Sequence, residues 1–202
     1  MKGALLNGPA NGLCNAVVIG SGEATAVQPE LFEARTRSTV RYADPAAWIT
    51  AAAVARAIAE VRDLLAVSQH EVGVIAVSDQ GPAHTMAEVN AATATGFSSP
   101  LRYAAASPGS LVGVTCIAFG FRGPTLNLTM NPDNGVPVAL TLCSAWLTRR
   151  VAGYMVLATF RATDSAAGFS RAVLLAHPEQ STRPANLRTQ SSVPDWLTNI
   201  GN

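Results

Sequence analysis

Few side chains in this sequence could carry covalent chemistry. The 202 residues contain three cysteines, Cys14, Cys116 and Cys143, whose spacing suits neither a metal site nor a disulfide framework. A cysteine attacks an acyl group as a thiolate, which needs a nearby base or a helix N-terminus. Cys116 and Cys143 lie in apolar segments that predict core positions, where burial raises the thiol pKa. We therefore regard neither as a good nucleophile.

Acid–base chemistry has three weak candidates. Asp79 follows an apolar run, His84 lies shortly after it, and Asp133 lies in the turn-forming stretch Asn131-Pro132-Asp133-Asn134-Gly135. No partner for any of them can be identified from the sequence, and isolated carboxylates are usually surface residues. We therefore assign no catalytic residue with confidence, and we expect neither a metal nor a cofactor. A Gly-x-Gly at residues 20–22 lacks the third glycine of a dinucleotide site.

The composition narrows the classes of partner. The chain is 49% hydrophobic and only 13% charged, with a formal net charge of +1 and no basic block. These values give no sign of nucleic-acid binding, and the apolar runs are too short for a membrane span. The first residues lack the apolar core of a signal peptide, which predicts a cytoplasmic protein. So few charges suggest that a partner covers part of the surface, although a tightly packed Ala-rich monomer is the alternative.

Strand-like and helix-like segments alternate along the chain. Asp44 and Pro45 are a good N-cap and first residue for an Ala-rich helix. The pattern predicts an α/β domain with a largely parallel sheet, preceded by a loose lead-in at 1–13 and followed by a polar tail at 181–202. The arginine-bearing stretch 35–41 reads as a loop, and 110–121 is ambiguous between strand and helix. Strands are expected at 15–20, 72–79, 125–130, 154–160 and 172–177, and further helices at 85–95 and 136–150.

The order of these features resembles the β-ketoacyl synthases, which have the thiolase fold. The resemblance is carried by residues 99–129, which read SPLRYAAASPGSLVGVTCIAFGFRGPTLNLT. Within them, Phe119-Gly120 is followed by Arg122-Gly123-Pro124 and then by a strand, an order that is similar to the family's pattern. The resemblance extends over about residues 14–180, which is the N-terminal half of such an enzyme. It implies a helix at 110–121 and a single thiolase-like half with a mostly parallel or mixed five-stranded sheet flanked by helices.

The resemblance also identifies a nucleophile position. In the family a cysteine follows the Gly-Pro by eight residues and begins a long buried helix, and the same count from Pro124 reaches Pro132. Proline has no nucleophilic side chain and no backbone N–H for an oxyanion hole. The two histidines of the family's second half have no counterpart, since His70, His84 and His177 all lie in the first-half region. The resemblance therefore implies a protein that does not catalyse condensation by itself.

Two segments are expected to meet a partner. The helix at 136–148 is apolar around nearly its whole circumference, so we expect it to be buried on all sides. A second copy, another thiolase-fold protein or the tail could provide the cover. Family members also dimerise through the strand before the nucleophile, here 125–130. The predicted interface residues are Leu126, Leu128, Val138, Leu142 and Trp146.

Three functions remain open. The first is a non-condensing partner, resembling a chain-length factor, that forms a dimer with an active ketosynthase of polyketide or fatty-acid-type biosynthesis. The second is a homodimeric enzyme that performs isomerisation, cyclisation, dehydration or hydrolysis on a carrier-bound acyl intermediate. The third is a module that binds an acyl group or an acyl carrier protein.

Overall fold

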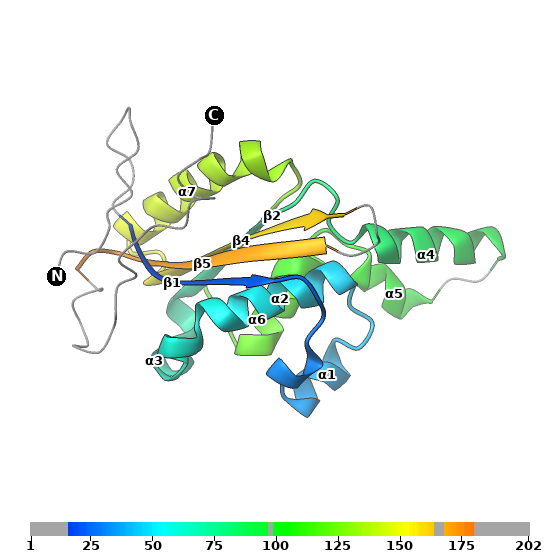
Figure 1. The fold of residues 1–202 in the computed structure, drawn as a ribbon, viewed down its shortest axis with the longest axis horizontal. Coiled ribbons are helices and arrows are strands. Elements are labelled where there is room, and N and C mark those ends of the chain that lie inside the picture. Colours follow the sequence, from blue (N-terminus) through cyan, green and yellow to red (C-terminus); the bar gives the residue numbers. More distant parts are fainter. Residues whose placement is uncertain (1–15, 97–98, 164–167, 180–202) are drawn as a thin grey trace.

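The computed structural model describes residues 16–96, 99–163 and 168–179, which form a five-stranded sheet with helices on both faces (Figure 1). This architecture confirms the predicted α/β fold and each of the five expected strands. The predicted lead-in at 1–13 and tail at 181–202 lie outside the described residues. The strands are β1 Val17–Ala24, β2 Val72–Val77, β3 Thr125–Leu128, β4 Tyr154–Ala162 and β5 Gly168–Ala176, in the spatial order β1-β5-β4-β2-β3.

The sheet is mixed. Strand β2 pairs in parallel with both β3 and β4, so that Ile75 lies opposite Leu126 on one side and Leu157 on the other. Strand β5 is antiparallel to β4 and to β1. The three parallel strands β4, β2 and β3 therefore end at the same edge of the sheet, and β3 is an outer strand.

The helices follow the predicted pattern in part, and a short helix at 100–105 was not predicted. The ambiguous segment is the helix α6, which ends where Gly120 adopts a φ of 71°. The arginine-bearing stretch is not simply a loop, because it contains the short helix α1. The helices are α1 Ala34–Thr39, α2 Pro45–Ala57, α3 Arg62–Val67, α4 Ala83–Ala94, α5 Pro100–Ala105, α6 Ser110–Phe119 and α7 Pro132–Thr148, with single 3-10 turns at Pro29–Leu31, Ala59–Val61 and Gln69–Glu71.

Helix α2 covers one face of the sheet. It packs on β1 and β5 and also against α6, and most of its residues are buried. Its close approach depends on two glycines of β1. A Cβ on Gly20 would lie 2.0 Å from the carbonyl oxygen of Ala57, and one on Gly22 would lie 2.4 Å from that of Ala53. The Gly-x-Gly of the sequence therefore has a packing role.

Helix α7 covers the opposite face, above β2 and β4 (Figure 1). Its inner side buries Val136, Ala139, Cys143 and Leu147. Val138 on its other side is 44% exposed, so the described residues of this chain do not bury the helix on all sides by themselves. Among the described elements, no helix packs extensively on the outer side of α7 as α6 does on α2, and apolar residues there reach the surface. None of the described helices is both long and apolar enough to span a membrane.

Candidate functional site

The candidate site is the connection between β3 and the first turn of α7. Strand β3 ends at Leu128, and α7 begins at Pro132 beside the last residues of β2. In α/β proteins, ligands bind beyond the carboxyl ends of parallel strands, which is where this connection lies. The turn that contains Pro132 therefore lies at an edge of the fold where ligands can bind.

The N-terminus of α7 uses its own backbone donors. The Asn131 side chain accepts a hydrogen bond from the Asp133 N–H at 2.9 Å. The Asn131 carbonyl accepts from the N–H groups of Asn134 and Gly135 at 3.0 and 2.9 Å. Pro132 has no N–H to offer. Between residues 132 and 135, then, each backbone donor is absent or already bonded, so the turn supplies no free donor for an oxyanion.

The space at the turn is filled by packing. Pro132 is buried, and Gly135 lies so close to the sheet that a Cβ there would be 2.3 Å from Val77 Cγ1. The same Cβ would lie 2.8 Å from Met130 Cγ. Only glycine fits this contact without displacing its neighbours. The turn is therefore a well-packed fold element whose first helical residue carries no reactive group.

The three acid–base candidates do not form a catalytic group. Asp133, exposed in the first turn of α7, forms an ion pair with Arg161 near the end of β4. His84 lies on α4 with its Nε2 at 3.5 Å from Glu88, which also pairs with Arg102. Asp79 is exposed after β2. Among the described residues no hydrogen bond or ion pair joins any two of these three candidates.

The cysteines are equally unsuited to catalysis. Burial raises the pKa of the Cys116 thiol to about 11, so it remains protonated at neutral pH. Cys143 is fully buried in the middle of α7, away from its N-terminus. In the described ranges, no group of three or more His, Cys, Asp or Glu residues could hold a metal ion.

The five predicted interface residues lie on one side of the sheet. Leu126 and Leu128 of β3 pack against the same core as Leu142 and Trp146 of α7, and all four are half-buried. Val138 extends this surface along the helix. Val138, Leu142 and Trp146 are spaced four residues apart, which places them along one side of α7. We call these three residues the α7 outer face.

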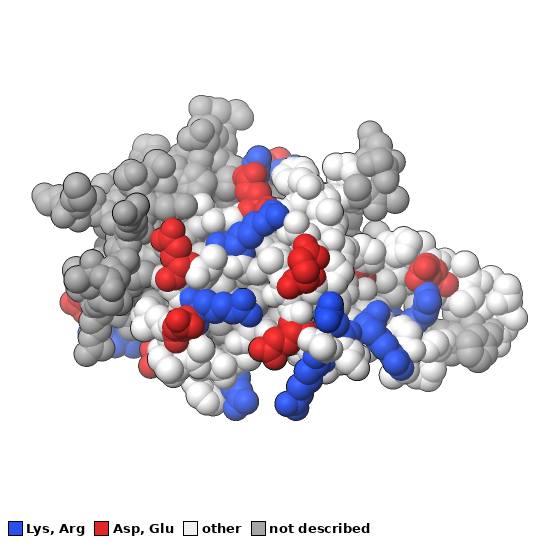
Figure 2. Space-filling view, turned by 60° about the horizontal axis from the view of Figure 1, so that its bottom comes forward, with Lys and Arg blue, Asp and Glu red and all other residues white. Residues whose placement is uncertain are grey.

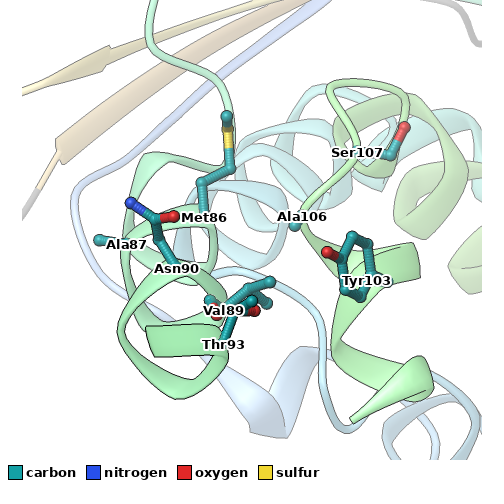
Figure 3. Close-up of a pocket in the computed structure, with 8 residues that line it drawn as sticks. All are labelled: Met86, Ala87, Val89, Asn90, Thr93, Tyr103, Ala106 and Ser107. Carbon is teal, nitrogen blue, oxygen red and sulfur yellow. Dashed lines mark hydrogen bonds between the residues drawn. The ribbon is translucent and has the colours of Figure 1, made fainter. Parts of the chain in front are cut away.

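A cavity of about 640 Å³ lies between α4 and α5, away from the turn. Figure 3 shows Met86, Asn90 and Thr93 of α4 on one side and Tyr103 of α5 on the other. Sequence reasoning missed this cavity, because it depends on how two short helices cross. Met86 and Tyr103, which line it, are both exposed.

A second missed feature is the role of Asp44. One oxygen of its side chain accepts from Ala46 N–H at 2.8 Å, as a predicted N-cap should. The other accepts from Thr85 N–H at 2.7 Å, and the residue is buried. A single carboxylate thus ties the start of α4 to the start of α2, across 41 residues of sequence. This contact positions one wall of the cavity.

Comparisons with known proteins support the fold. No protein-family model matches the sequence, and no curated protein matches it. Ketosynthase twelve of the bacillaene polyketide synthase from Bacillus amyloliquefaciens is similar over 82% of this chain and 42% of its own, with a TM-score of 0.63 and 11% identity. The ketosynthase AntDE, solved with its acyl carrier protein AntF and bound to a hexaketide, is similar over 82% and 63%, with a TM-score of 0.67 and 15% identity.

A third similar structure is the ketosynthase ApeO in complex with its chain length factor ApeC, from Xenorhabdus doucetiae. It matches 69% of this chain and 60% of its own, with a TM-score of 0.52 and 16% identity. The chain thus spans less than two thirds of the length of each of these three proteins. Its described residues have the fold of a single thiolase-like half, similar to that of the ketosynthases and chain length factors of polyketide synthases.

Proposed function

We propose that this chain is a ketosynthase-like subunit that does not condense acyl groups itself and acts beside an active ketosynthase. The observation that carries the proposal is Pro132, the first residue of α7, in a turn whose backbone donors are all absent or bonded. Acyl transfer needs an activated nucleophile and donors for the developing oxyanion. The turn offers neither, while its packing around Gly135 is that of an intact fold element.

The partner role is supported by the apolar surface around α7. Leu126, Leu128 and the α7 outer face form one surface on a chain with only 13% charged residues. Burial of a large apolar side chain contributes about 1.5–3 kcal/mol, so a protein that covers this surface would gain substantially. One of the similar solved structures is itself a complex of a ketosynthase with a chain length factor. We propose that a ketosynthase covers the α7 outer face.

A carrier protein is a second proposed partner. Arg35, Arg37 and Arg41 are exposed on and after α1, and none forms an ion pair with an acidic residue in the described ranges. Figure 2 shows basic and acidic side chains interspersed over one face of the molecule. Unpaired arginines favour an acidic partner surface. One similar ketosynthase was solved with its acyl carrier protein.

Co-expression with ketosynthases encoded near this chain tests the partner role. We expect co-elution with one of them, and a changed product chain length when this chain is left out. Val138→Asp should weaken the complex at least about tenfold, because it places a charge in an apolar contact. Asn90→Asp, a charge added at an exposed position on α4, controls for added charge. A chain that never co-elutes, or a complex indifferent to Val138→Asp, would refute the proposal.

The alternative of a homodimeric enzyme has one observation in its favour. Asp133 and Arg161 form an ion pair near the carboxyl ends of the parallel strands, where a substrate would bind. Such a pair could position an acyl intermediate, and its carboxylate could accept a proton from it, without a covalent step. Turnover of acyl thioesters by the purified chain, abolished by Asp133→Asn and by Arg161→Gln, would support this function. Absence of turnover with the unchanged chain would exclude this enzyme function and leave the partner role as the remaining proposal.

A further inference from the structure

The sheet face on which α7 lies extends beyond the reach of that helix. Helix α7 packs extensively on β2 and β4, whereas β5 and then β1 lie further along the sheet. Neighbouring strands lie about 4.8 Å apart, so β1 is about 10 Å from β4 in the plane of the sheet. A helix with its side chains has a radius of only about 5–6 Å. Helix α7 therefore cannot cover the far edge of this face.

Three apolar side chains on that edge are nevertheless buried. Val18 of the outer strand β1 is 2% exposed, and Val173 and Leu175 of β5 are fully buried. All three belong to the same core cluster as the inner side of α7, so they face the α7 side of the sheet. The other described helices that pack extensively on the sheet, α2 and α6, contribute to the core on the opposite face. We call Val18, Val173 and Leu175 the β1–β5 strip, and its burial requires a cover that the described helices do not supply.

The described chain ends close to this strip and on the same side of the sheet. Strand β5 ends at Ala176, which lies opposite Val17 of β1. The Glu179 carboxylate, three residues further on, pairs with the Arg150 guanidinium at 3.3 Å, and Arg150 follows the end of α7. The chain therefore leaves the sheet beside the C-terminal end of α7 rather than on the α2 side.

The residues that follow have the composition of a cover. We call residues 180–202, which lie outside the described ranges, the C-terminal segment. Most of them are polar, but four apolar residues gather near the end, namely Val193, Trp196, Leu197 and Ile200. The stretch from Glu179 to Trp196 can extend over up to about 55 Å, and α7 is only about 25 Å long, so Trp196 can reach any point of the strip. Large apolar and aromatic side chains gain the most free energy from such a contact.

We propose that the C-terminal segment folds back over the β1–β5 strip, with Trp196, Leu197 and Ile200 packed on it. The strip offers too few side chains for a separate protein, which needs about 20–30 residues on each side of an interface. A segment of the same chain needs less surface, because the chain already holds it near the strip. The inference goes beyond the proposed function and does not depend on it, since the α7 outer face remains available to the ketosynthase.

A matched pair of charge substitutions in the full chain tests this contact. Trp196→Asp should lower the midpoint of urea unfolding, followed by circular dichroism, by at least about 0.5 M, because it places a charge against an apolar strip. Thr198→Asp adds the same charge at a polar position of the same segment and should leave the midpoint unchanged. A Trp196→Asp chain with the midpoint of the unchanged chain would overturn the inference.

The same measurement identifies the other possible covers. If Leu6→Asp lowers the midpoint and Trp196→Asp does not, the segment before β1 covers the strip. If the midpoint rises with protein concentration and is indifferent to Trp196→Asp, a second copy covers it. Either result would overturn the inference.

Fluorescence tests the position of the indole in a chain whose C-terminal segment is intact, so it remains informative if Trp196→Asp fails to fold. With Trp48→Phe and Trp146→Phe in place, Trp196 is the only tryptophan. We expect a blue-shifted emission, and quenching by acrylamide that is several-fold weaker than in the urea-unfolded chain. An emission like that of the unfolded chain would contradict the proposed contact.

Two neighbouring leucines of β5 show whether the indole lies on the strip. Leu175→Ala, within the strip, should make Trp196 easier to quench. Leu174→Ala should not, because Leu174 is equally buried but belongs to the core on the α2 side. Equal quenching in the two variants would place the indole elsewhere and overturn the inference. Failure of any ketosynthase to co-elute would refute the proposed function and leave these results unchanged.

Discussion

Helices α2 and α7 cover opposite faces of the same sheet, and both are apolar, yet they are buried to different extents. Of the thirteen residues of α2, nine are buried, because the sheet lies on one side and α6 on another. Of the seventeen residues of α7, seven are buried, and its extensive contacts are with β2 and β4. An apolar helix is therefore not necessarily a covered helix. The number of layers packed around the helix determines how much of its surface is exposed to solvent.

The two helices also differ in how closely they approach the sheet. Both faces use glycine for a close contact, Gly20 and Gly22 below α2 and Gly135 within α7 itself. On the α2 side the nearest atom to each glycine is a backbone carbonyl oxygen, which cannot move without shifting the helix. On the α7 side they belong to the side chains of Val77 and Met130, which can adjust more easily. The α2 layer is thus the more rigid of the two.

Gly20→Val should have the largest effect. The new Cβ would lie 2.0 Å from a carbonyl oxygen of α2, and the resulting overpacking should cost at least about 3 kcal/mol in the free energy of unfolding. Urea denaturation followed by circular dichroism measures this loss. Gly113→Ala provides the control, because a Cβ there meets nothing within 4 Å and should stabilise α6 by up to about 1 kcal/mol. A Gly20→Val chain of normal stability would contradict the rigid α2 layer.

Two leucines of α7 test its inner and outer sides. Leu147 is fully buried, so Leu147→Ala should lower the free energy of unfolding by about 2–5 kcal/mol through lost contacts and a cavity. Leu142 is only half-buried, so Leu142→Ala should cost clearly less in the isolated chain. In the ketosynthase complex the ranking should change, with Leu142→Ala weakening binding more than Leu147→Ala. Equal costs in the isolated chain would show that the outer side is covered after all.

The smallest effect is expected at the exposed end of α7. Asp133→Asn removes an ion pair with Arg161 and a favourable charge at a helix N-terminus, and exposure limits the cost to less than about 1 kcal/mol. Raising the salt concentration should reduce the difference further, because surface charges are screened. Thermal unfolding at low and high salt measures both effects. A larger, salt-independent loss would mean that Asp133 is held by more than this pair.

Much of the fold could be predicted from local patterns. The Asp44-Pro45 helix start functions as predicted, because capping depends on a few adjacent residues. Periodicity alone did not decide the nature of 110–121, and the resemblance correctly favoured helix. The stretch around α1 was missed, because a six-residue helix has almost no periodic signal.

The candidate site was predicted in part. Its position at Pro132 came from counting residues after Gly123-Pro124, and the structure places that proline at the first turn of α7. The bond from Thr85 to Asp44 and the cavity between α4 and α5 were not predicted. Both join segments that are distant in sequence, and a pattern read along one segment contains no information about the other.

The sequence by itself determined the strands, the capped start of α2 and the lack of a nucleophilic side chain at Pro132, because each depends on the identity of neighbouring residues. Only the tertiary structure decided which apolar residues are covered. Val54 of α2 and Val138 of α7 are the same residue type in two apolar helices, yet one is fully buried and the other is 44% exposed. Burial depends on what packs from outside, and that is a property of the assembled layers.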